Sequence, residues 1–189
     1  MPISFDLEQL RVKFNISNYF ETGLFDVSNE TSIIKALKCN FKKLYSVEIY
    51  YPFVDKANNI LKNDIDNGRL TIINDDSTHL NKYLTDELFS EKTLFFLDAH
   101  IDNLRVKEYT DKCPLFNELD AIGNLSVKNN IICIDDLRIL NEKFPWGEEK
   151  YGEINWIDEI KKKILCINSH YEFDTLDGII PNDILLAYV

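Results

Sequence analysis

The sequence predicts an α/β protein: a three-layer sandwich in which helices cover both faces of a mostly parallel, seven-stranded sheet that ends in an antiparallel hairpin. Strand and helix patterns alternate through five strand-helix units, and right-handed crossovers then place helices on either side of a parallel sheet. The apolar runs 94–97 and 131–134 are typical of strands buried on both faces. The end of the chain reads as two strands around the turn Pro181-Asn182-Asp183, which predicts the hairpin.

Strands are expected where a short run rich in apolar residues is bounded by turn-forming residues. Along the chain these segments are 18–21, 43–48, 69–74, 93–98, 130–134, 171–176 and 184–189. Asn67-Gly68 supplies the turn before the third strand. Helical spacing of apolar residues separates most of these segments.

Helices are expected where apolar residues return on one face, as Ile33, Leu37 and Phe41 do. In chain order these segments are 4–13, 31–41, 52–65, 77–89, 114–125 and 154–164. Ser4 is the expected cap of the first helix, and Pro52 suits the first turn of the third. No linker, internal repeat or low-complexity tract divides the chain, so we expect one domain over 1–189, with 1–16 as an N-terminal helical extension.

Composition narrows the classes of function. The chain has 189 residues, 45% of them hydrophobic and 12% aromatic, which is enough for a substantial core. A formal net charge of -11 opposes a nucleic-acid partner, because phosphate binding needs a clustered basic surface. No apolar run approaches the roughly 20 residues of a membrane span, so we expect a cytoplasmic protein without a membrane partner. The four cysteines stand singly, which predicts neither a zinc site nor a disulfide framework. The oligomeric state stays open, with a homodimer as one option.

Each of the first five expected strands has an acidic residue at its carboxyl end, either as its last residue or directly after it. They are Glu21, Glu48, Asp75-Asp76, Asp98 and Asp135-Asp136. In an open parallel sheet, ligands bind beyond the carboxyl ends of the strands, near the point where the strand order reverses. Any one of these acids alone is better explained as a helix cap or a loop residue. Together they would crowd negative charge along one edge, which predicts that cations or hydroxyl groups bind there.

The turn after the first strand indicates the class of ligand. A dinucleotide fold needs G-x-G-x-x-G to approach a pyrophosphate, whereas Glu21-Thr22-Gly23 offers a single glycine. A nucleoside without phosphates relaxes that demand: Glu21 suits an ammonium group, and Glu48 suits ribose hydroxyls. S-adenosylmethionine combines these groups with an adenine edge. Its expected contacts are Glu21, Thr22, Gly23, Glu48, Ile49, Asp75, Asp76, Ser77 and Asp98.

Six segments, taken in order, also resemble one known family. They are Glu21-Thr22-Gly23, Tyr45-Ser46-Val47-Glu48, Asn74-Asp75-Asp76-Ser77, Leu97-Asp98-Ala99-His100, the helix from Cys113-Pro114-Leu115 to Ile122, and Ile134-Asp135-Asp136-Leu137-Arg138. This series is similar to that of a group within the class I S-adenosylmethionine-dependent methyltransferases, marked by an L-D-A-H motif and an I-D-D-x-R strand end. The resemblance covers roughly residues 19–138 and implies a Rossmann-like sandwich. One position departs from the pattern, because Phe25-Asp26-Val27 stands where members usually carry a second glycine or small residue.

The residues at the ends of the fourth and fifth strands indicate a metal-binding site and a general base. Oxygen ligands from Asp98, Asp135 and Asp136, together with water, suit Mg2+. In metal-dependent O-methyltransferases of the resembled fold, acids at such positions hold the ion, which lowers the pKa of the acceptor hydroxyl and orients it for in-line attack. Helix capping and pairing with Arg138 are the alternative roles for these acids. Asp98 and His100 are the expected catalytic residues, with neutral His100 as general base and loop capping as its alternative.

These patterns predict an S-adenosylmethionine-dependent methyltransferase that methylates the oxygen of a small-molecule or glycan acceptor, with Mg2+ as an assisting ion. The preference for a sugar comes only from the resembled family. A non-catalytic nucleoside-binding module of the same fold is one alternative, supported by the altered glycine turn and opposed by the retained acids and His100. An NAD-dependent oxidoreductase is disfavoured because the required glycines are missing.

Overall fold

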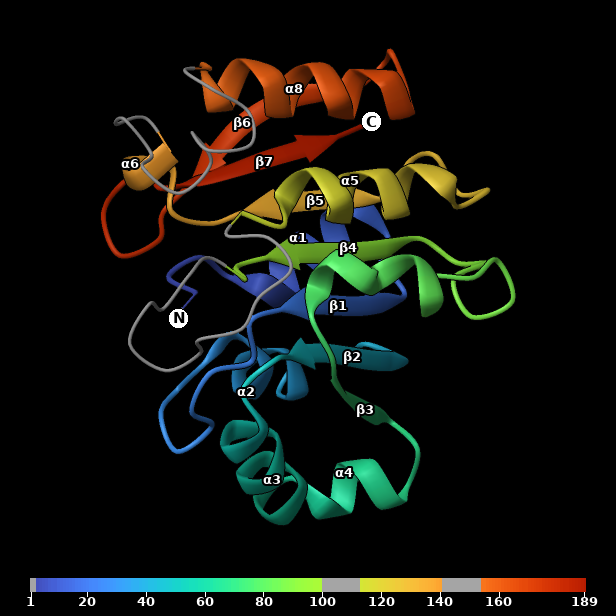
Figure 1. Cartoon of the computed structure of the whole chain (residues 1–189), viewed down its shortest axis with the longest axis vertical. Coiled ribbons are helices and arrows are strands. Elements are labelled where there is room, and N and C mark those ends of the chain that lie inside the picture. The colour runs from blue at the N-terminus through green and yellow to red at the C-terminus, as the bar shows by residue number, and fades with distance from the viewer. Residues whose placement is uncertain (1–2, 100–112, 141–153) are drawn as a thin grey trace.

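The computed structural model describes residues 3–99, 113–140 and 154–189, which build a sheet of seven strands (Figure 1). The strands are β1 (Asn18–Thr22), β2 (Lys43–Glu48), β3 (Leu70–Asn74), β4 (Thr93–Leu97), β5 (Ile131–Ile134), β6 (Glu172–Leu176) and β7 (Ile184–Tyr188). Their order across the sheet is β3-β2-β1-β4-β5-β7-β6. All of the expected strands are present, and each end lies within one residue of its predicted position.

The direction of the strands brings five carboxyl ends to one edge of the sheet. β1 pairs in parallel with β2 and β4, β2 with β3, and β4 with β5. In Figure 1 the arrowheads of β1, β4 and β5 therefore lie at the same edge. β7 runs antiparallel to β5, pairing Leu185 with Ile134, and β6 runs antiparallel to β7. The predicted mostly parallel sheet with a C-terminal antiparallel hairpin is confirmed.

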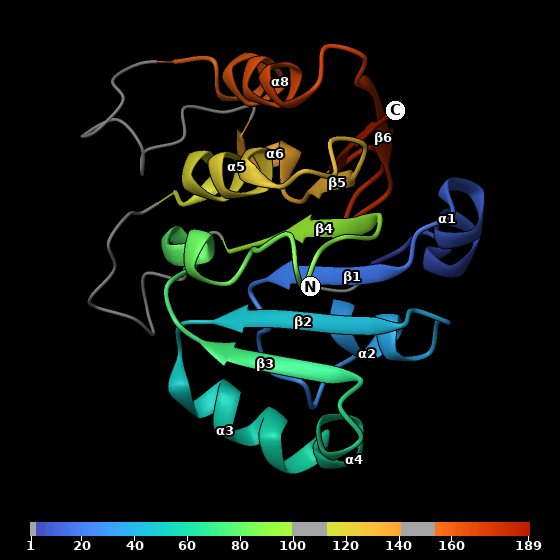
Figure 2. The same cartoon turned by 90° about the vertical axis from the view of Figure 1, so that its right-hand side faces the viewer.

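Helices pack against both faces of this sheet. They are α1 (Leu7–Phe14), α2 (Ser32–Leu37), α3 (Tyr51–Ile60), α4 (Lys62–Asp66), the 3-10 helix η1 (Ser77–Lys82), α5 (Leu115–Asn124), α6 (Leu137–Leu140) and α8 (Trp156–Ile167). One apolar cluster joins α1, α2 and α3 to one face, and another joins η1, α5, α6 and α8 to the other. Tyr19 and Phe20 of β1 point into opposite clusters, because successive side chains of a strand alternate. The turned view in Figure 2 shows α8 near β6 and α4 beyond β3, at opposite ends of the sheet.

The caps of the first helices differ from those expected. α1 begins at Leu7 because the side chain of Asp6, and not that of Ser4, accepts the bond from Gln9 N at 2.9 Å. The Ser4 hydroxyl instead donates to Gly178 O at 2.6 Å. α2 ends at Leu37 and does not reach residue 41 as predicted.

Two of the predicted helices in the middle of the chain differ from those in the structure. The helix over 52–65 is divided at Leu61, whose φ of -99° and ψ of 18° separate α3 from α4. The helix over 77–89 is only the short 3-10 turn η1. Phe89 accounts for the second difference: its buried ring lies 5.7 Å from the ring of Phe20. Packing against the sheet therefore overrides the helical spacing of this segment.

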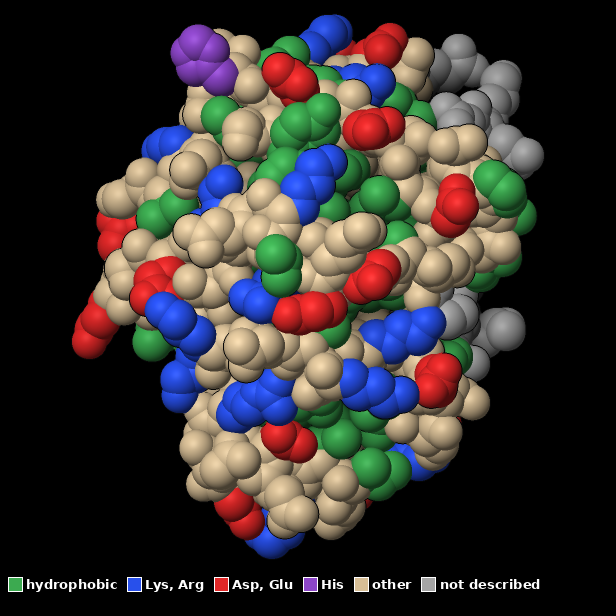
Figure 3. All heavy atoms as spheres, turned by 180° about the vertical axis from the view of Figure 1, so that it is seen from behind, with side chains coloured by type: hydrophobic (Ala, Val, Ile, Leu, Met, Phe, Trp, Pro, Cys, Tyr) green, Lys and Arg blue, Asp and Glu red, His purple; other side chains and the backbone are tan. Residues whose placement is uncertain are grey.

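Three further features concern membrane spans, surface charge and cysteines. None of the described helices is both long and apolar enough to cross a bilayer. On the face shown in Figure 3, the Lys and Arg side chains are interspersed with Asp and Glu. All four cysteines are free thiols, with Cys113 and Cys133 buried.

Candidate functional site

The strand order reverses between β1 and β4. In open parallel sheets the ligand crevice lies beyond the carboxyl ends of the strands at such a point, so we expect it here. Asp98 follows β4 directly, and its backbone N–H donates to the carbonyl oxygen of Thr22 at 3.2 Å and to the Thr22 hydroxyl at 3.3 Å. Asp98 keeps some exposed surface, while its carboxyl group lies deep among protein atoms. Burial raises the pKa of this carboxyl to about 7, and the charges of Asp136 and Glu21 add to the increase. The other expected catalytic residue, His100, lies outside the described residues.

Gly23 forms the tightest contact at this edge. Its φ is 85°, and a Cβ atom there would lie 2.3 Å from the carbonyl oxygen of Asp98. Its N–H donates to Val47 O at 2.9 Å, which ties the turn to β2 as well. Gly23 is therefore required both by its backbone conformation and by the approach of the β1 turn to β4.

Phe25 is the first of the three residues, Phe25-Asp26-Val27, that stand where the resembled family usually has a second glycine or small residue. Its φ is 58°, so the backbone adopts the left-handed conformation that glycine favours. The Phe25 ring lies 5.1 Å from that of Phe53 in α3, and Asp26 pairs with Lys56 of the same helix at 2.8 Å. The turn thus keeps a glycine-like backbone at residue 25, and contacts with α3 offset a strain of about 1 kcal/mol.

Glu48, at the end of β2, is held in a fixed orientation beside this turn. One of its carboxylate oxygens accepts the N–H of Phe25 at 3.0 Å, and the other accepts the N–H of Tyr50 at 2.8 Å. Each carboxylate oxygen has two lone pairs, so this anchoring is compatible with further hydrogen bonds to ribose hydroxyls. Asn74 holds the following backbone, donating to the carbonyl oxygens of Glu48 at 2.8 Å and Ile49 at 3.2 Å.

The two acids after β3 are engaged within their own turn. Asp75 accepts hydrogen bonds from the Tyr83 hydroxyl at 2.6 Å and from His79 at 2.9 Å. Burial raises the pKa of Asp75, but hydrogen bonds from Tyr83 and His79 outweigh it, so the pKa lies below its usual range. Asp76 caps η1 by accepting the N–H of Thr78 at 2.9 Å. Ser77 is buried beside them. Contacts of these residues with a cofactor stay predictions.

Glu21, expected near the ammonium group of a ligand, is enclosed within the protein. Its carboxylate accepts three hydroxyl groups: Ser32 at 2.6 Å, Ser46 at 2.8 Å and Tyr19 at 3.0 Å. Burial raises its pKa to about 7, although the hydrogen bonds from Ser32 and Ser46 oppose the shift. This network fastens β1 to β2 and α2, and a contact between Glu21 and a ligand stays a prediction.

The buried Glu21 makes stability depend on pH. Its pKa is raised from 4.5 to about 7 in the folded chain, so the folded state holds the proton more tightly than the unfolded state. Its contribution to the free energy of unfolding is therefore expected to fall as the pH rises from about 4.5 to about 7. Glu21→Gln should remove this contribution, changing the difference in unfolding free energy from wild type by about 2 kcal/mol between these pH values. Urea unfolding measures this difference, with exposed Glu87→Gln as control; parallel curves for wild type and Glu21→Gln would contradict the assignment.

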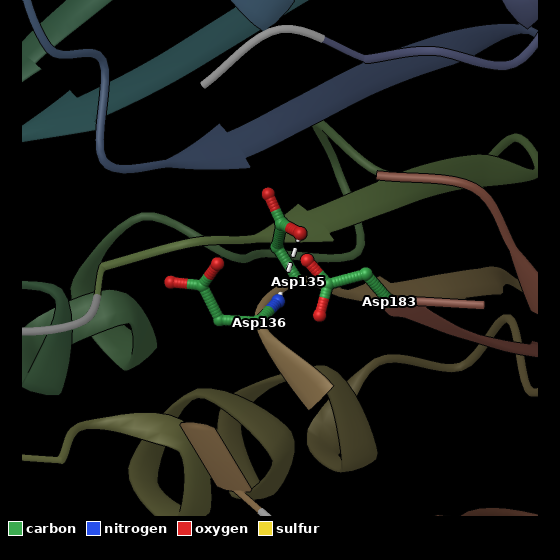
Figure 4. A group of neighbouring side chains, drawn as sticks. All are labelled: Asp135, Asp136 and Asp183. Carbon is green, nitrogen blue, oxygen red and sulfur yellow. Dashed lines mark hydrogen bonds between the residues drawn. The ribbon is translucent and has the colours of Figure 1, made fainter. Parts of the chain in front are cut away.

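A group of three acids follows β5. One carboxylate oxygen from each of Asp135, Asp136 and Asp183 lies within 4.8 Å of those of the other two (Figure 4). The Asp136 N–H donates to the Asp135 side chain at 2.8 Å. Asp183 was not among the expected site residues. It arrives here because β7 is antiparallel, so the residue before β7 lies beside the residues that follow β5.

Arg138 supplies the positive charge of this acid cluster. Its guanidinium pairs with Asp136 at 2.6 Å and with Asp183, and its backbone N–H donates to Asp183 at 3.0 Å. Carboxylate oxygens suit a hard cation, but Arg138 already neutralises two of the three acids. Asp98 does not belong to this group of described residues. The predicted ligand set of Asp98, Asp135 and Asp136 therefore does not fit a resident ion while Arg138 keeps this position.

Comparison with known proteins relates this geometry to a fold. No protein-family model matches the chain, and no curated protein sequence matches it. An O-methyltransferase from Bacillus cereus in complex with S-adenosylhomocysteine is similar in structure, with a TM-score of 0.58 and 13% sequence identity over 97% of this chain and 78% of that one. The chain has the class I methyltransferase fold.

A second similar structure is that of an enzyme not named as a methyltransferase. Spermidine synthase from Thermotoga maritima is similar with a TM-score of 0.51 and 11% identity, covering 92% of this chain and 53% of that one. At these identities the similarity establishes the architecture of the methyltransferase fold. The chemistry must be argued from the residues at the edge between β1 and β4.

Proposed function

We propose that the chain is an S-adenosylmethionine-dependent methyltransferase that methylates the oxygen of a small-molecule or sugar-type acceptor. The observation that carries the proposal is the arrangement at the reversal of strand order between β1 and β4, where Gly23 lies against the Asp98 backbone and the Phe25 N–H is bound by Glu48. In a class I fold, an anchored acid at the end of β2 can accept hydrogen bonds from the ribose hydroxyls of the cofactor. The similar O-methyltransferase that holds S-adenosylhomocysteine supports the same class of ligand.

Each residue has a distinct part in the proposed reaction. Glu48 binds the ribose hydroxyls, while Asp76 and Ser77 border the adenine edge. Asp98 lies next to the reacting groups. The methyl group passes from sulfur to the acceptor oxygen, and the hydroxyl proton leaves to a base, for which Asp98 and His100 are the candidates. The raised pKa of Asp98, about 7, suits a group that exchanges a proton near neutral pH.

Assistance by Mg2+ stays a prediction with a structural obstacle. Arg138 would have to leave Asp136 and Asp183 before an ion could bind the three acids. The proposed reaction therefore has no step that depends on a metal. The expectations of a cytoplasmic location, a small-molecule acceptor and the absence of a nucleic-acid partner are likewise proposals.

A second candidate is a nucleoside-binding module without turnover. One observation favours it: the large side chain of Phe25 lies in the turn where the resembled family usually has a second glycine or small residue, and it packs on Phe53. Such a module would bind S-adenosylmethionine and S-adenosylhomocysteine yet transfer no methyl group. An NAD-dependent oxidoreductase is the third reading, and the single glycine of the turn opposes it.

Calorimetric titration with S-adenosylmethionine, S-adenosylhomocysteine and NAD tests the proposal. We expect both adenosyl ligands to bind, and Glu48→Ala to weaken S-adenosylmethionine binding by about 1 to 3 kcal/mol through lost ribose hydrogen bonds. The control is Glu172→Ala, in which an exposed acid of the edge strand β6 is removed without effect on affinity. Binding of NAD alone would contradict the proposal, and unaltered affinity in Glu48→Ala would reject the role of that residue.

A further inference from the structure

Glu118 of α5 is a buried acid close to Thr22 and Ser77, at the edge of the sheet where the ligand is expected. It lies in the first turn of α5 and has no exposed surface. Within the described part of the chain, neither of its carboxylate oxygens has a partner in hydrogen-bonding geometry. An unsatisfied carboxylate in the protein interior costs several kcal/mol unless it is protonated or meets a positive group.

Three other buried acids, Glu21, Glu48 and Asp183, have partners for their carboxylates, which sets Glu118 apart from them. Glu21 accepts three hydroxyl groups, Glu48 accepts two backbone N–H groups, and Asp183 pairs with Arg138. Among the ion pairs of the described residues, none includes Glu118. The lysine that α8 brings to α5, Lys163, pairs with the exposed Asp120. The protein itself therefore provides no cation for the Glu118 carboxylate within this part of the chain.

The surroundings of Glu118 relate its carboxylate to the ligand edge. Two hydroxyl groups lie near the carboxylate, those of Ser77 at the start of η1 and Thr22 at the end of β1. Neither hydroxyl is in hydrogen-bonding geometry with it. Burial raises the pKa of Glu118 to about 7; these hydroxyls lower it, and the charges of Asp76 and Asp98 raise it. Because Thr22 and Asp98 flank the point where the strand order reverses, the Glu118 carboxylate lies near the expected ligand crevice.

We propose that Glu118 senses the positive charge of the ligand in this crevice, so that it favours the sulfonium of S-adenosylmethionine over the neutral thioether of the product. This inference rests on the proposed function and adds a determinant of cofactor selectivity. The two ligands share their adenosine and amino acid groups and differ in the methyl group and the charge on sulfur. A buried, unpaired carboxylate interacts strongly with such a charge because little water screens it. Loss of that charge on methyl transfer would then weaken the hold on the product.

Glu118→Gln tests the proposal because it removes the charge and keeps the shape. The probes are S-adenosylmethionine and S-adenosylhomocysteine, titrated calorimetrically into the full chain at about pH 8.5, where a carboxyl group with a pKa near 7 is ionised. We expect Glu118→Gln to weaken S-adenosylmethionine binding about tenfold and to change S-adenosylhomocysteine binding less than about twofold. Asp120→Asn, which removes an exposed charge from the same helix, should leave both affinities unchanged.

Other outcomes separate the possible failures. If Glu118→Gln weakens the binding of both ligands equally, Glu118 has a packing role and the inference is overturned. Unchanged affinities for both ligands would also overturn it. If Glu118→Gln does not fold, Glu118→Asp takes its place: with the charge retained, it should preserve the ratio of the two affinities, and a tenfold change in that ratio would overturn the inference. Absence of binding of either ligand to the wild type would overturn the proposed function itself, and the inference with it.

Discussion

A Gly23→Ala variant is expected to be about 3 kcal/mol less stable than the wild type, and its binding of S-adenosylmethionine should be too weak to measure. The added Cβ would lie 2.3 Å from the carbonyl oxygen of Asp98, a separation that requires the backbone to move. Movement would break the hydrogen bond from Gly23 N to Val47 O and shift the strand ends that border the crevice. Chemical denaturation measures the first effect, and calorimetry measures the second.

Gly68→Ala is the matched control for this experiment. Gly68 also has a positive φ, 71°, but its nearest contact for an added Cβ is the Lys43 Nζ atom at 3.9 Å. Only the conformational strain should remain, at about 1 kcal/mol, and ligand binding should be unaffected. Equal destabilisation by the two substitutions would show that the close approach of Gly23 to Asp98 has no energetic importance.

Replacing Arg138 by alanine is expected to destabilise the fold by about 3 kcal/mol. The side chains of Asp136 and Asp183 are almost fully buried, and the substitution leaves both without the guanidinium that pairs with them. The vacated position is then surrounded by carboxylate oxygens, which suit a hard divalent cation. Mg2+ at millimolar concentration should therefore raise the melting temperature of Arg138→Ala and leave that of the wild type unchanged.

The control for Arg138 is Arg11→Ala in α1. Arg11 pairs with the half-exposed Glu8 at 2.7 Å, and an ion pair that solvent reaches contributes about 1 kcal/mol, less than the buried pairs of Arg138. Stabilisation of the wild type by Mg2+, or activity that disappears with EDTA and returns with Mg2+, would show that the acids bind an ion despite Arg138. It would then restore the sequence-based prediction of a metal.

Much of the fold could be predicted because the strands carry strong local signals. The apolar runs of β4 and β5 and the alternation of strands with helices fixed the sheet to within one residue at each end. The helix expected over 77–89 could not be excluded in the same way. The spacing of its residues is helical, whereas the burial of Phe89 beside Phe20 depends on a contact with a strand far away in the sequence.

The convergence of the acidic strand ends was also predictable, since parallel strands bring their carboxyl ends to one edge. The direction of each side chain was not. Both faces of β1 are buried, so the sequence could not reveal that Glu21 turns into a network of hydroxyl groups. Asp183 was missed because its place depends on which strand β7 pairs with. Glu118 lies within the helix that resembles the family motif, but its burial without a hydrogen-bond partner is visible only in three dimensions.

The turn at Phe25 illustrates how a sequence can depart from a pattern that the backbone keeps. The missing glycine supported the reading as a module without turnover. In the structure, residue 25 retains the left-handed conformation, and its N–H is bound by Glu48. The hydrogen bond to Glu48 and the ring packing on α3 thus stabilise a left-handed backbone conformation that glycine would adopt more easily.

A crystal structure of the chain grown with S-adenosylhomocysteine tests the central claim most directly. We predict that the ribose hydroxyls will lie against the Glu48 carboxylate and the sulfur atom at the crevice between β1 and β4, above Thr22 and Asp98. A ligand bound at another surface, or saturating ligand that leaves this crevice empty, would contradict the account.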